Sequence, residues 1–214
     1  MNRTAELFLS LLYPENVACH ACGEEAIVNE DGLCSSCAAG IRRCEKPAAL
    51  QFADGFTAGL LYTEEAANAV HRFKYGDARY LAEFFVSFLA LPEAWAFDAI
   101  VPVPLHKRRL RRRGYNQSAL LAEALSARTG VPVREDLLRR IRYTKTQTAL
   151  NAKRRMRNLR GAFEASPEVK EMRLLLIDDV RTTGATLSEC ARALRAAGAE
   201  TVYACAACER DLER

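Results

Sequence analysis

The sequence predicts an α/β protein with a mostly parallel sheet and flanking helices, joined to a small N-terminal cysteine module. From residue 98 onward, strand patterns alternate with helical patterns of about 12 residues, which is typical of right-handed βαβ units. The run LLLI at 174–177 is apolar on both faces, as a central parallel strand is. Five of the eight cysteines fall within residues 19–44. We therefore expect an N-terminal helix and cysteine module at 1–47 and an α/β domain at 48–214.

Composition and charge narrow the class of protein. Half of the 214 residues are apolar, so a chain of this length can bury roughly 70% of its unfolded surface without disulfide help. The net charge of +4 is modest, but six of the seven residues at 107–113 are cationic. Such a cluster favours polyanionic partners, either phosphorylated metabolites or nucleic acid. No segment approaches the ~20 apolar residues of a membrane span, and the cytoplasm is the expected compartment.

The hydrophobic periodicity assigns each element in turn. Between residues 142 and 160 the chain is polar and basic enough to form a mobile loop. The expected elements, in chain order, are an amphipathic helix at 4–13, a strand at 55–63, a helix ending near 76, an apolar helix within 79–91, a strand at 98–104, a basic loop, a helix at 116–129, a short strand pair near 131–133 and 137–143, a strand at 173–180, a helix at 186–197 and a strand at 201–209.

The cysteine module has the spacing of a zinc ribbon. CHAC at 19–22 and CSSC at 34–37 are two CxxC pairs with eleven residues between them. Each pair presents two thiolates on one turn, and two facing pairs complete a tetrahedral Zn²⁺ site. The predicted structural zinc ligands are Cys19, Cys22, Cys34 and Cys37, with His20 and Cys44 as alternatives for one of them.

A second cysteine pair at the C-terminus does not predict a metal site. Cys205 and Cys208 are three residues apart on a predicted strand, so their side chains point to opposite faces of the sheet. We interpret both, and Cys190 on its helix, as small buried hydrophobic residues.

The stretch LLLIDDVRTTGAT at 174–186 predicts a binding site. Ligands of open α/β sheets bind beyond the carboxyl ends of strands, where Asp178 and Asp179 lie. The following turn enters a helix, whose free backbone N–H groups form an anion cradle. A phosphorylated ribose suits both parts, with its hydroxyls on the aspartates and its 5′-phosphate in the loop. The expected phosphate loop comprises Thr182, Thr183, Gly184, Ala185 and Thr186.

This stretch resembles the 13-residue motif of type I phosphoribosyltransferases, which bind 5-phosphoribosyl-1-pyrophosphate (PRPP) with Mg²⁺. The chain contains neither GxxxxGK[ST] nor GxGxxG, so nothing indicates an ATP-driven motor or a dinucleotide enzyme. By this resemblance, the basic stretch 101–117 would hold the pyrophosphate. The expected pyrophosphate residues are Arg109, Arg113, Gly114, Asn116 and Gln117, although a solvated basic loop is the alternative.

The full set of motifs resembles the competence protein F (ComF) family. It comprises the CxxC pairs, RFKYG at 72–76, the basic stretch, TKTQTALNAKRRMRNLRGAF at 144–163 and the Asp-Asp loop. The family is described as phosphoribosyltransferase-like and linked to DNA uptake in natural transformation. The resemblance implies a flexible loop that closes over PRPP. Its marked positions are Thr146, Gln147, Asn151, Arg155 and Asn158.

The chain departs from the family patterns at two positions. A third CxxC pair is frequent in the family, but here Pro47 stands where the partner of Cys44 would be. Purine-salvage phosphoribosyltransferases carry an aspartate two residues before the loop glycine, and here that residue is Thr182. A purine acceptor is therefore in doubt.

Two functions remain open from the sequence. One is a phosphoribosyltransferase that displaces pyrophosphate from PRPP with an unidentified acceptor. The other is a non-catalytic protein with the same fold that binds single-stranded DNA or a protein of the DNA-uptake machinery. Tyr75, Tyr115 and Tyr143 are the candidates for base stacking, with core packing as their alternative role.

Overall fold

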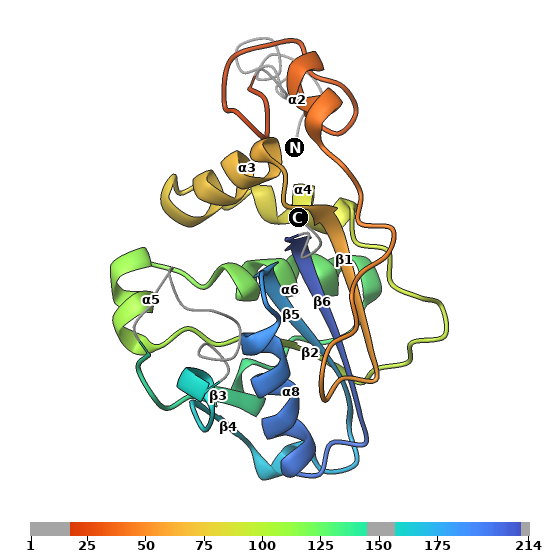
Figure 1. The fold of residues 1–214 in the computed structure, drawn as a ribbon, viewed down its shortest axis with the longest axis vertical. Coiled ribbons are helices and arrows are strands. Elements are labelled where there is room, and N and C mark those ends of the chain that lie inside the picture. The colour runs from red at the N-terminus through yellow and green to blue at the C-terminus, as the bar shows by residue number, and fades with distance from the viewer. Residues whose placement is uncertain (1–17, 145–156, 211–214) are drawn as a thin grey trace, which may run out of the picture.

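The computed structural model describes residues 18–144 and 157–210. Its centre is a four-stranded sheet in the order β1-β6-β5-β2, with every neighbouring pair parallel (Figure 1). Its strands are β1 (Gly55–Leu61), β2 (Ala99–Pro102), β5 (Arg173–Arg181) and β6 (Thr201–Glu209). This is the predicted α/β class, with the LLLI run inside the central strand β5.

Six α-helices surround or precede this sheet in the described part of the chain. They are α2 (Ser35–Gly40), α3 (Glu64–Tyr75), α4 (Leu81–Ser87), α5 (Lys107–Arg113), α6 (Gln117–Thr129) and α8 (Ala185–Ala196). A second, antiparallel sheet pairs β3 (Leu138–Arg140) with β4 (Phe163–Ala165). Among the described residues, no helix is both long enough and apolar enough to cross a membrane.

The two faces of the sheet carry separate hydrophobic clusters. Leu175 and Ile177 of β5 point into a cluster shared with α3, α4 and α6. Leu174 and Leu176 point into the opposite cluster, which α8 and the small β3-β4 sheet complete. All four side chains are fully buried. Alternation along a strand explains why an unbroken apolar run is needed here, because each face needs its own share of apolar residues.

Two predictions about secondary structure were wrong. The basic stretch is not a loop, because Lys107–Arg113 forms the helix α5, with the His106 ring accepting a hydrogen bond from Arg108 N at 3.2 Å. Arginine and lysine have good helix propensity, which outweighs the repulsion between their exposed charges. The predicted strand pair also differs: β3 pairs with β4, whereas Val133 makes a single parallel bridge to Ile100.

The remaining elements lie where the pattern placed them, with small shifts at their ends. The apolar helix α4 ends at Ser87 rather than near Leu91. Helix α6 begins after Asn116, whose side chain accepts a hydrogen bond from Ser118 N at 3.2 Å and caps the helix. The amphipathic helix expected at 4–13 lies outside the described residues.

Candidate functional site

The carboxyl end of β5 carries the two aspartates, and three elements meet there. Asp178 Oδ1 accepts hydrogen bonds from Ser118 Oγ at 3.0 Å and from the Asp179 backbone amide at 2.9 Å. Lys74, one residue before the end of α3, forms an ion pair with Asp179, with 2.9 Å between Nζ and Oδ2. The two carboxylates are thus held by α6 on one side and α3 on the other.

The electrostatics of this acidic pair differ from those of exposed aspartates. Burial, reinforced by the charge of Asp179, raises the pKa of Asp178 to about 7 from its ordinary 3.8. Burial lowers the pKa of Lys74, but the Asp179 carboxylate outweighs that effect and the net pKa of Lys74 is raised. The ammonium therefore stays charged beside Asp179, while Asp178 gains or loses its proton near neutral pH.

The predicted phosphate loop connects β5 directly to α8. Gly184 occupies the N-cap of α8 with φ +73°, a left-handed conformation that favours glycine. A Cβ at this position would lie 2.9 Å from Leu50 Cδ1 and 3.1 Å from Arg181 Nε. The loop therefore fits tightly between its neighbours and leaves the first amides of a 12-residue helix at the carboxyl edge of the sheet.

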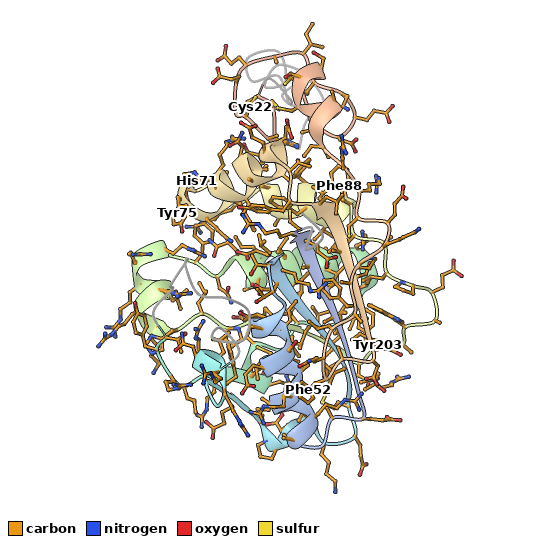
Figure 2. All side chains as sticks on the ribbon, in the orientation of Figure 1. Cys22, Phe52, His71, Tyr75, Phe88 and Tyr203 are labelled. Atoms are coloured by element: carbon orange, nitrogen blue, oxygen red, sulfur yellow. The ribbon has the colours of Figure 1, made fainter. Side chains whose placement is uncertain are left out.

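The predicted pyrophosphate residues lie on α5 and at the start of α6. Arg113 Nη1 donates to Gln117 Oε1 at 2.5 Å, and its guanidinium carbon lies 5.2 Å from the centre of the Tyr75 ring. Tyr75 itself is exposed at the end of α3 (Figure 2). Asn116 caps α6, and Gly114 ends α5. Arg109 Nη2 donates to the Thr144 carbonyl at 3.2 Å. Their contact with pyrophosphate stays a prediction.

A buried ion pair lies behind the phosphate loop. Arg181 pairs with Glu209 at the ends of β5 and β6, and its guanidinium also donates to the carbonyls of Ala48 and Ala49. The Cys44 thiol donates to the second carboxylate oxygen of Glu209 at 3.2 Å. Burial, followed by the hydrogen bond to Glu209 and then by the charge of Glu209, raises the pKa of Cys44 to about 12. Cys44 is therefore a protonated hydrogen-bond donor in this structure and not one of the clustered cysteines.

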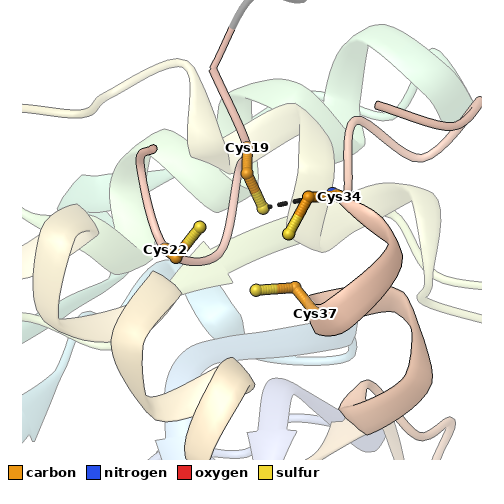
Figure 3. A group of neighbouring side chains, drawn as sticks. All are labelled: Cys19, Cys22, Cys34 and Cys37. Carbon is orange, nitrogen blue, oxygen red and sulfur yellow. Dashed lines mark hydrogen bonds between the residues drawn. The ribbon is translucent and has the colours of Figure 1, made fainter. Parts of the chain in front are cut away.

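The two CxxC pairs come together as predicted. The sulfur atoms of Cys19, Cys22, Cys34 and Cys37 all lie within 4.8 Å of one another (Figure 3). Four thiolates bound at about 2.3 Å around one ion lie roughly 3.8 Å apart, so the cluster has the size of a tetrahedral metal site. His20 is not part of it, because its Nδ1 lies 3.2 Å from the Asp31 carbonyl.

The donor chemistry of the cluster also suits a metal. Cys34 N donates to Cys19 Sγ at 3.4 Å. Burial raises the pKa of Cys19, but hydrogen bonds from the amides of Cys34, Cys22 and Ala21 outweigh it and lower that pKa to about 6. At least one sulfur is thus a thiolate at neutral pH, which is the form that binds metal. Cys205 and Cys208, which were not expected to bind metal, are fully buried in the core, as expected. Both belong to the same hydrophobic cluster, so the expectation that they point to opposite faces of the sheet was wrong.

Some expected positions remain without a structural account. Of the marked lid residues, Thr146, Gln147, Asn151 and Arg155 lie outside the described residues. Asn158 is described, and its backbone carbonyl accepts a hydrogen bond from Arg142 Nη2 at 2.9 Å. The lid role of the segment stays a prediction.

Two residues that contact the acidic pair were not identified from the sequence. Lys74 lies within RFKYG, and Ser118 lies on the first turn of α6. Lys74 follows the buried Phe73 at the end of an apolar helical face. A charged residue in that place could have indicated an acidic partner nearby. Ser118 gave none, because serine near a helix start is common for reasons of capping alone.

Comparison with known proteins identifies the domain. Residues 115–213 match the family model of the phosphoribosyl transferase domain. Competence protein F of Haemophilus influenzae is 43% identical over 117 residues, which cover 53% of this chain and 49% of that protein. DNA utilization protein YhgH of Escherichia coli K12 is 41% identical over 111 residues, covering 52% of the chain and 49% of YhgH.

Other relatives of this chain are more distant. Competence protein ComFC of Bacillus subtilis is 33% identical over 139 residues, covering 62% of the chain and 55% of ComFC. The chain spans about half the length of the curated relatives it matches. Among solved structures, a glutamine PRPP amidotransferase from B. subtilis, complexed with ADP and GMP, aligns over 64% of this chain and 26% of its own, with 21% identity and a TM-score of 0.41. Adenine phosphoribosyltransferase from Thermoanaerobacter pseudethanolicus aligns over 69% and 87%, with 14% identity and a TM-score of 0.36.

Proposed function

We propose that this protein is a member of the ComF family and that it binds PRPP at the carboxyl edge of its parallel sheet. The observation that carries the proposal is the junction at the end of β5, where a carboxylate pair and a tight helix-entry loop follow each other without a break. Asp178 and Asp179 would accept hydrogen bonds from the ribose hydroxyls, and the loop from Thr182 to Thr186 would bind the 5′-phosphate.

The reaction that fits this site is transfer of the phosphoribosyl group. An acceptor nucleophile would form a bond to C1 of the ribose while the bond from C1 to the pyrophosphate oxygen breaks, and pyrophosphate would leave with that electron pair. Cations stabilise such a leaving group, and Arg109 and Arg113 of α5 are the candidates. Thr182 carries no ionisable group, so the acceptor would need no base from this position or would bring its own.

Zn²⁺ and Mg²⁺ would bind at different places in this protein. The four clustered thiols fit Zn²⁺, which would hold the two CxxC segments together. Mg²⁺ would supply positive charge to the pyrophosphate and enter with it. The acidic pair does not fit Mg²⁺ directly, because Lys74 already contacts Asp179 at 2.9 Å.

Calorimetry tests PRPP binding directly. Titration with PRPP in the presence of Mg²⁺ should give saturable heat, and Asp178→Asn combined with Asp179→Asn should abolish it. The matched control is Asp136→Asn combined with Glu168→Gln, which removes two exposed carboxylates paired with Arg134. Absence of heat in the unmodified protein at millimolar PRPP would contradict the proposal.

A second function is favoured by the exposed tyrosines beside α5. Tyr75 and Tyr143 are 60% and 40% exposed, and Arg113 and Arg108 lie over their rings at 5.2 and 5.3 Å. Aromatic faces beside cations are the usual means of binding single-stranded nucleic acid. Tyr115 does not belong to this surface, because it is buried and its hydroxyl donates to the Phe73 carbonyl at 2.6 Å. A role in DNA uptake is suggested by the names of the relatives alone.

Salt separates the DNA-binding function from PRPP binding. Affinity for single-stranded DNA should fall steeply with salt concentration and survive the double substitution of Asp178 and Asp179. Joint replacement of Tyr75 and Tyr143 by leucine should weaken it. DNA binding that persists unchanged in this leucine variant would argue against the tyrosine surface.

A further inference from the structure

The ion pair between Lys74 and Asp179 occupies the place where a divalent cation would bind the acidic pair. The two side chains are only 20% and 14% exposed, and the gap between Nζ and Oδ2 is 2.9 Å. On the other carboxylate, Asp178 Oδ1 already accepts from Ser118 Oγ and from the amide of Asp179. One oxygen of each carboxylate is thus already bound by the chain, and the other oxygen of each is where a ligand hydroxyl would bind.

The position of Lys74 is fixed by its helix. Phe73, directly before it, is fully buried, and the Phe73 carbonyl accepts hydrogen bonds from Tyr115 Oη at 2.6 Å and Gln117 Nε2 at 3.4 Å. The end of α3 is therefore tied to the start of α6, which also carries Ser118. The ammonium is held by the same framework that holds the carboxylates.

The positive charge of Lys74 opposes the binding of a metal ion to Asp179. A metal ion that coordinates Asp179 directly would stand within a few ångströms of a largely shielded ammonium, and like charges repel strongly where solvent is scarce. Arg113 adds a second positive charge near Lys74. Lys74 thus neutralises carboxylate charge that a metal ion neutralises at other acidic sites. An ammonium has three N–H donors, so those not used by Asp179 can reach a ligand hydroxyl.

We propose that Lys74 is the resident cation of the acidic pair, so that a phosphorylated pentose binds Asp178 and Asp179 without a directly coordinated metal ion. Any need for Mg²⁺ would then belong to the pyrophosphate alone. This inference rests on the proposed PRPP site for its ligand, but its claim about metal exclusion can be measured on the protein alone.

Binding of Mn²⁺, followed by electron paramagnetic resonance, tests metal exclusion without any sugar ligand. The zinc-loaded full chain should bind Mn²⁺ only weakly, and Lys74→Met should bind it about tenfold or more tightly because the competing charge is gone. Adding Asp179→Asn to Lys74→Met should remove the gained site. Lys74→Arg should resemble the unmodified protein. The matched control, Lys170→Met, removes a lysine in an exposed ion pair and should change nothing.

Ribose 5-phosphate provides the second measurement, because it lacks the pyrophosphate that would carry Mg²⁺ itself. Its affinity for the unmodified protein, measured by calorimetry, should change less than about twofold between Mg²⁺ and EDTA. In Lys74→Met it should become dependent on Mg²⁺. A merely structural ion pair would alter stability but would give neither the new Mn²⁺ site nor the new Mg²⁺ dependence.

The outcomes distinguish the inference from the proposed function. Tight Mn²⁺ binding at Asp179 in the unmodified protein, or ribose 5-phosphate binding that requires Mg²⁺ there, would overturn the inference, and neither measurement needs a variant to fold. Weak Mn²⁺ binding that rises in Lys74→Met supports the resident cation even if no sugar phosphate binds. In that case it is the proposed PRPP site that fails.

Discussion

The free energy of unfolding depends on pH through the carboxyl group of Asp178. Its carboxyl group faces a second carboxylate in a position with little water, and the pKa is raised to about 7. A raised acid pKa means that the folded protein binds the proton more tightly than the unfolded chain does. The stabilisation is therefore fully present below the unfolded pKa of about 3.8 and is lost as the pH rises through about 7.

Replacement of Asp178 by asparagine should remove this pH dependence. The amide oxygen can still accept from Ser118 and from the Asp179 amide, while the charge is absent at every pH. Between pH 5 and 8 the free energy of unfolding of the unmodified protein should fall by on the order of 1–3 kcal/mol relative to Asp178→Asn. Urea unfolding at a series of pH values measures this difference. Asp77→Asn, at an exposed aspartate, is the control, and equal pH slopes for all three proteins would refute the prediction.

At the scale of elements, the junction between β5 and α8 is the most constrained part of the site. The strand ends in Arg181, which is buried in its ion pair with Glu209, and the helix begins after a glycine in the left-handed region. The loop between them is therefore fixed at both of its ends. Such rigidity suits a site that must present several amides to one anion without reorganising.

Gly184→Ala tests this constraint, with Gly130→Ala as a matched control. Both glycines have φ +73°, but a Cβ at Gly130 meets nothing within 4 Å, whereas at Gly184 it meets Leu50 and Arg181. Gly130→Ala should cost about 1 kcal/mol from backbone strain alone, and Gly184→Ala about 2 kcal/mol because contacts must also shift. Chemical denaturation measures both, and calorimetry should show weaker PRPP binding only for Gly184→Ala. Equal losses of stability would mean that the loop is not tightly packed.

At the scale of the whole molecule, the cysteine cluster is joined to the α/β core. Cys19 and Cys37 belong to the same hydrophobic cluster as Phe73 of α3. Arg72 Nη1 donates to the Cys19 carbonyl at 2.9 Å and to the His20 carbonyl at 2.8 Å. Arg72 is two residues from Lys74, so the helix α3 contacts both the cysteine module and the acidic pair. In Figure 1, α3 lies between the N-terminal module and the sheet. The domain boundary near residue 47 itself stays a prediction.

Loss of the metal should therefore weaken the whole molecule. Reduced protein purified without chelators should contain about one zinc per chain by elemental analysis. Cys37→Ala should lose it, with a fall in Tm on the order of 10 °C, because binding energy in such sites is folding energy. Cys190→Ala is the control, since it also removes a buried thiol but lies outside the cluster. Zinc-free protein, or equal zinc loss in both variants, would contradict the prediction.

The sequence by itself determined those features that depend on neighbouring residues. The apolar run of β5 followed by two acids and a helix-entry turn predicts a ligand-binding strand end, since strand period, charge and glycine all lie within 13 residues. The CxxC spacing likewise identifies a thiol cluster, because each turn brings its own pair together. These local patterns were sufficient for the fold class and for the cysteine cluster, which the structure confirms.

Only the tertiary structure decided what surrounds these features. Lys74 and Ser118 lie 105 and 60 residues before their aspartate partners, and no local pattern indicates that the end of α3 meets the start of α6. The partner of β3 and the hydrogen bond from Cys44 to Glu209, which are 165 residues apart, likewise depend on tertiary packing. The sequence thus marks where the carboxylates lie, while the packing of the helices decides which cation they hold. Side-chain periodicity is a property of one element, whereas a charge partner is set by how several elements pack together.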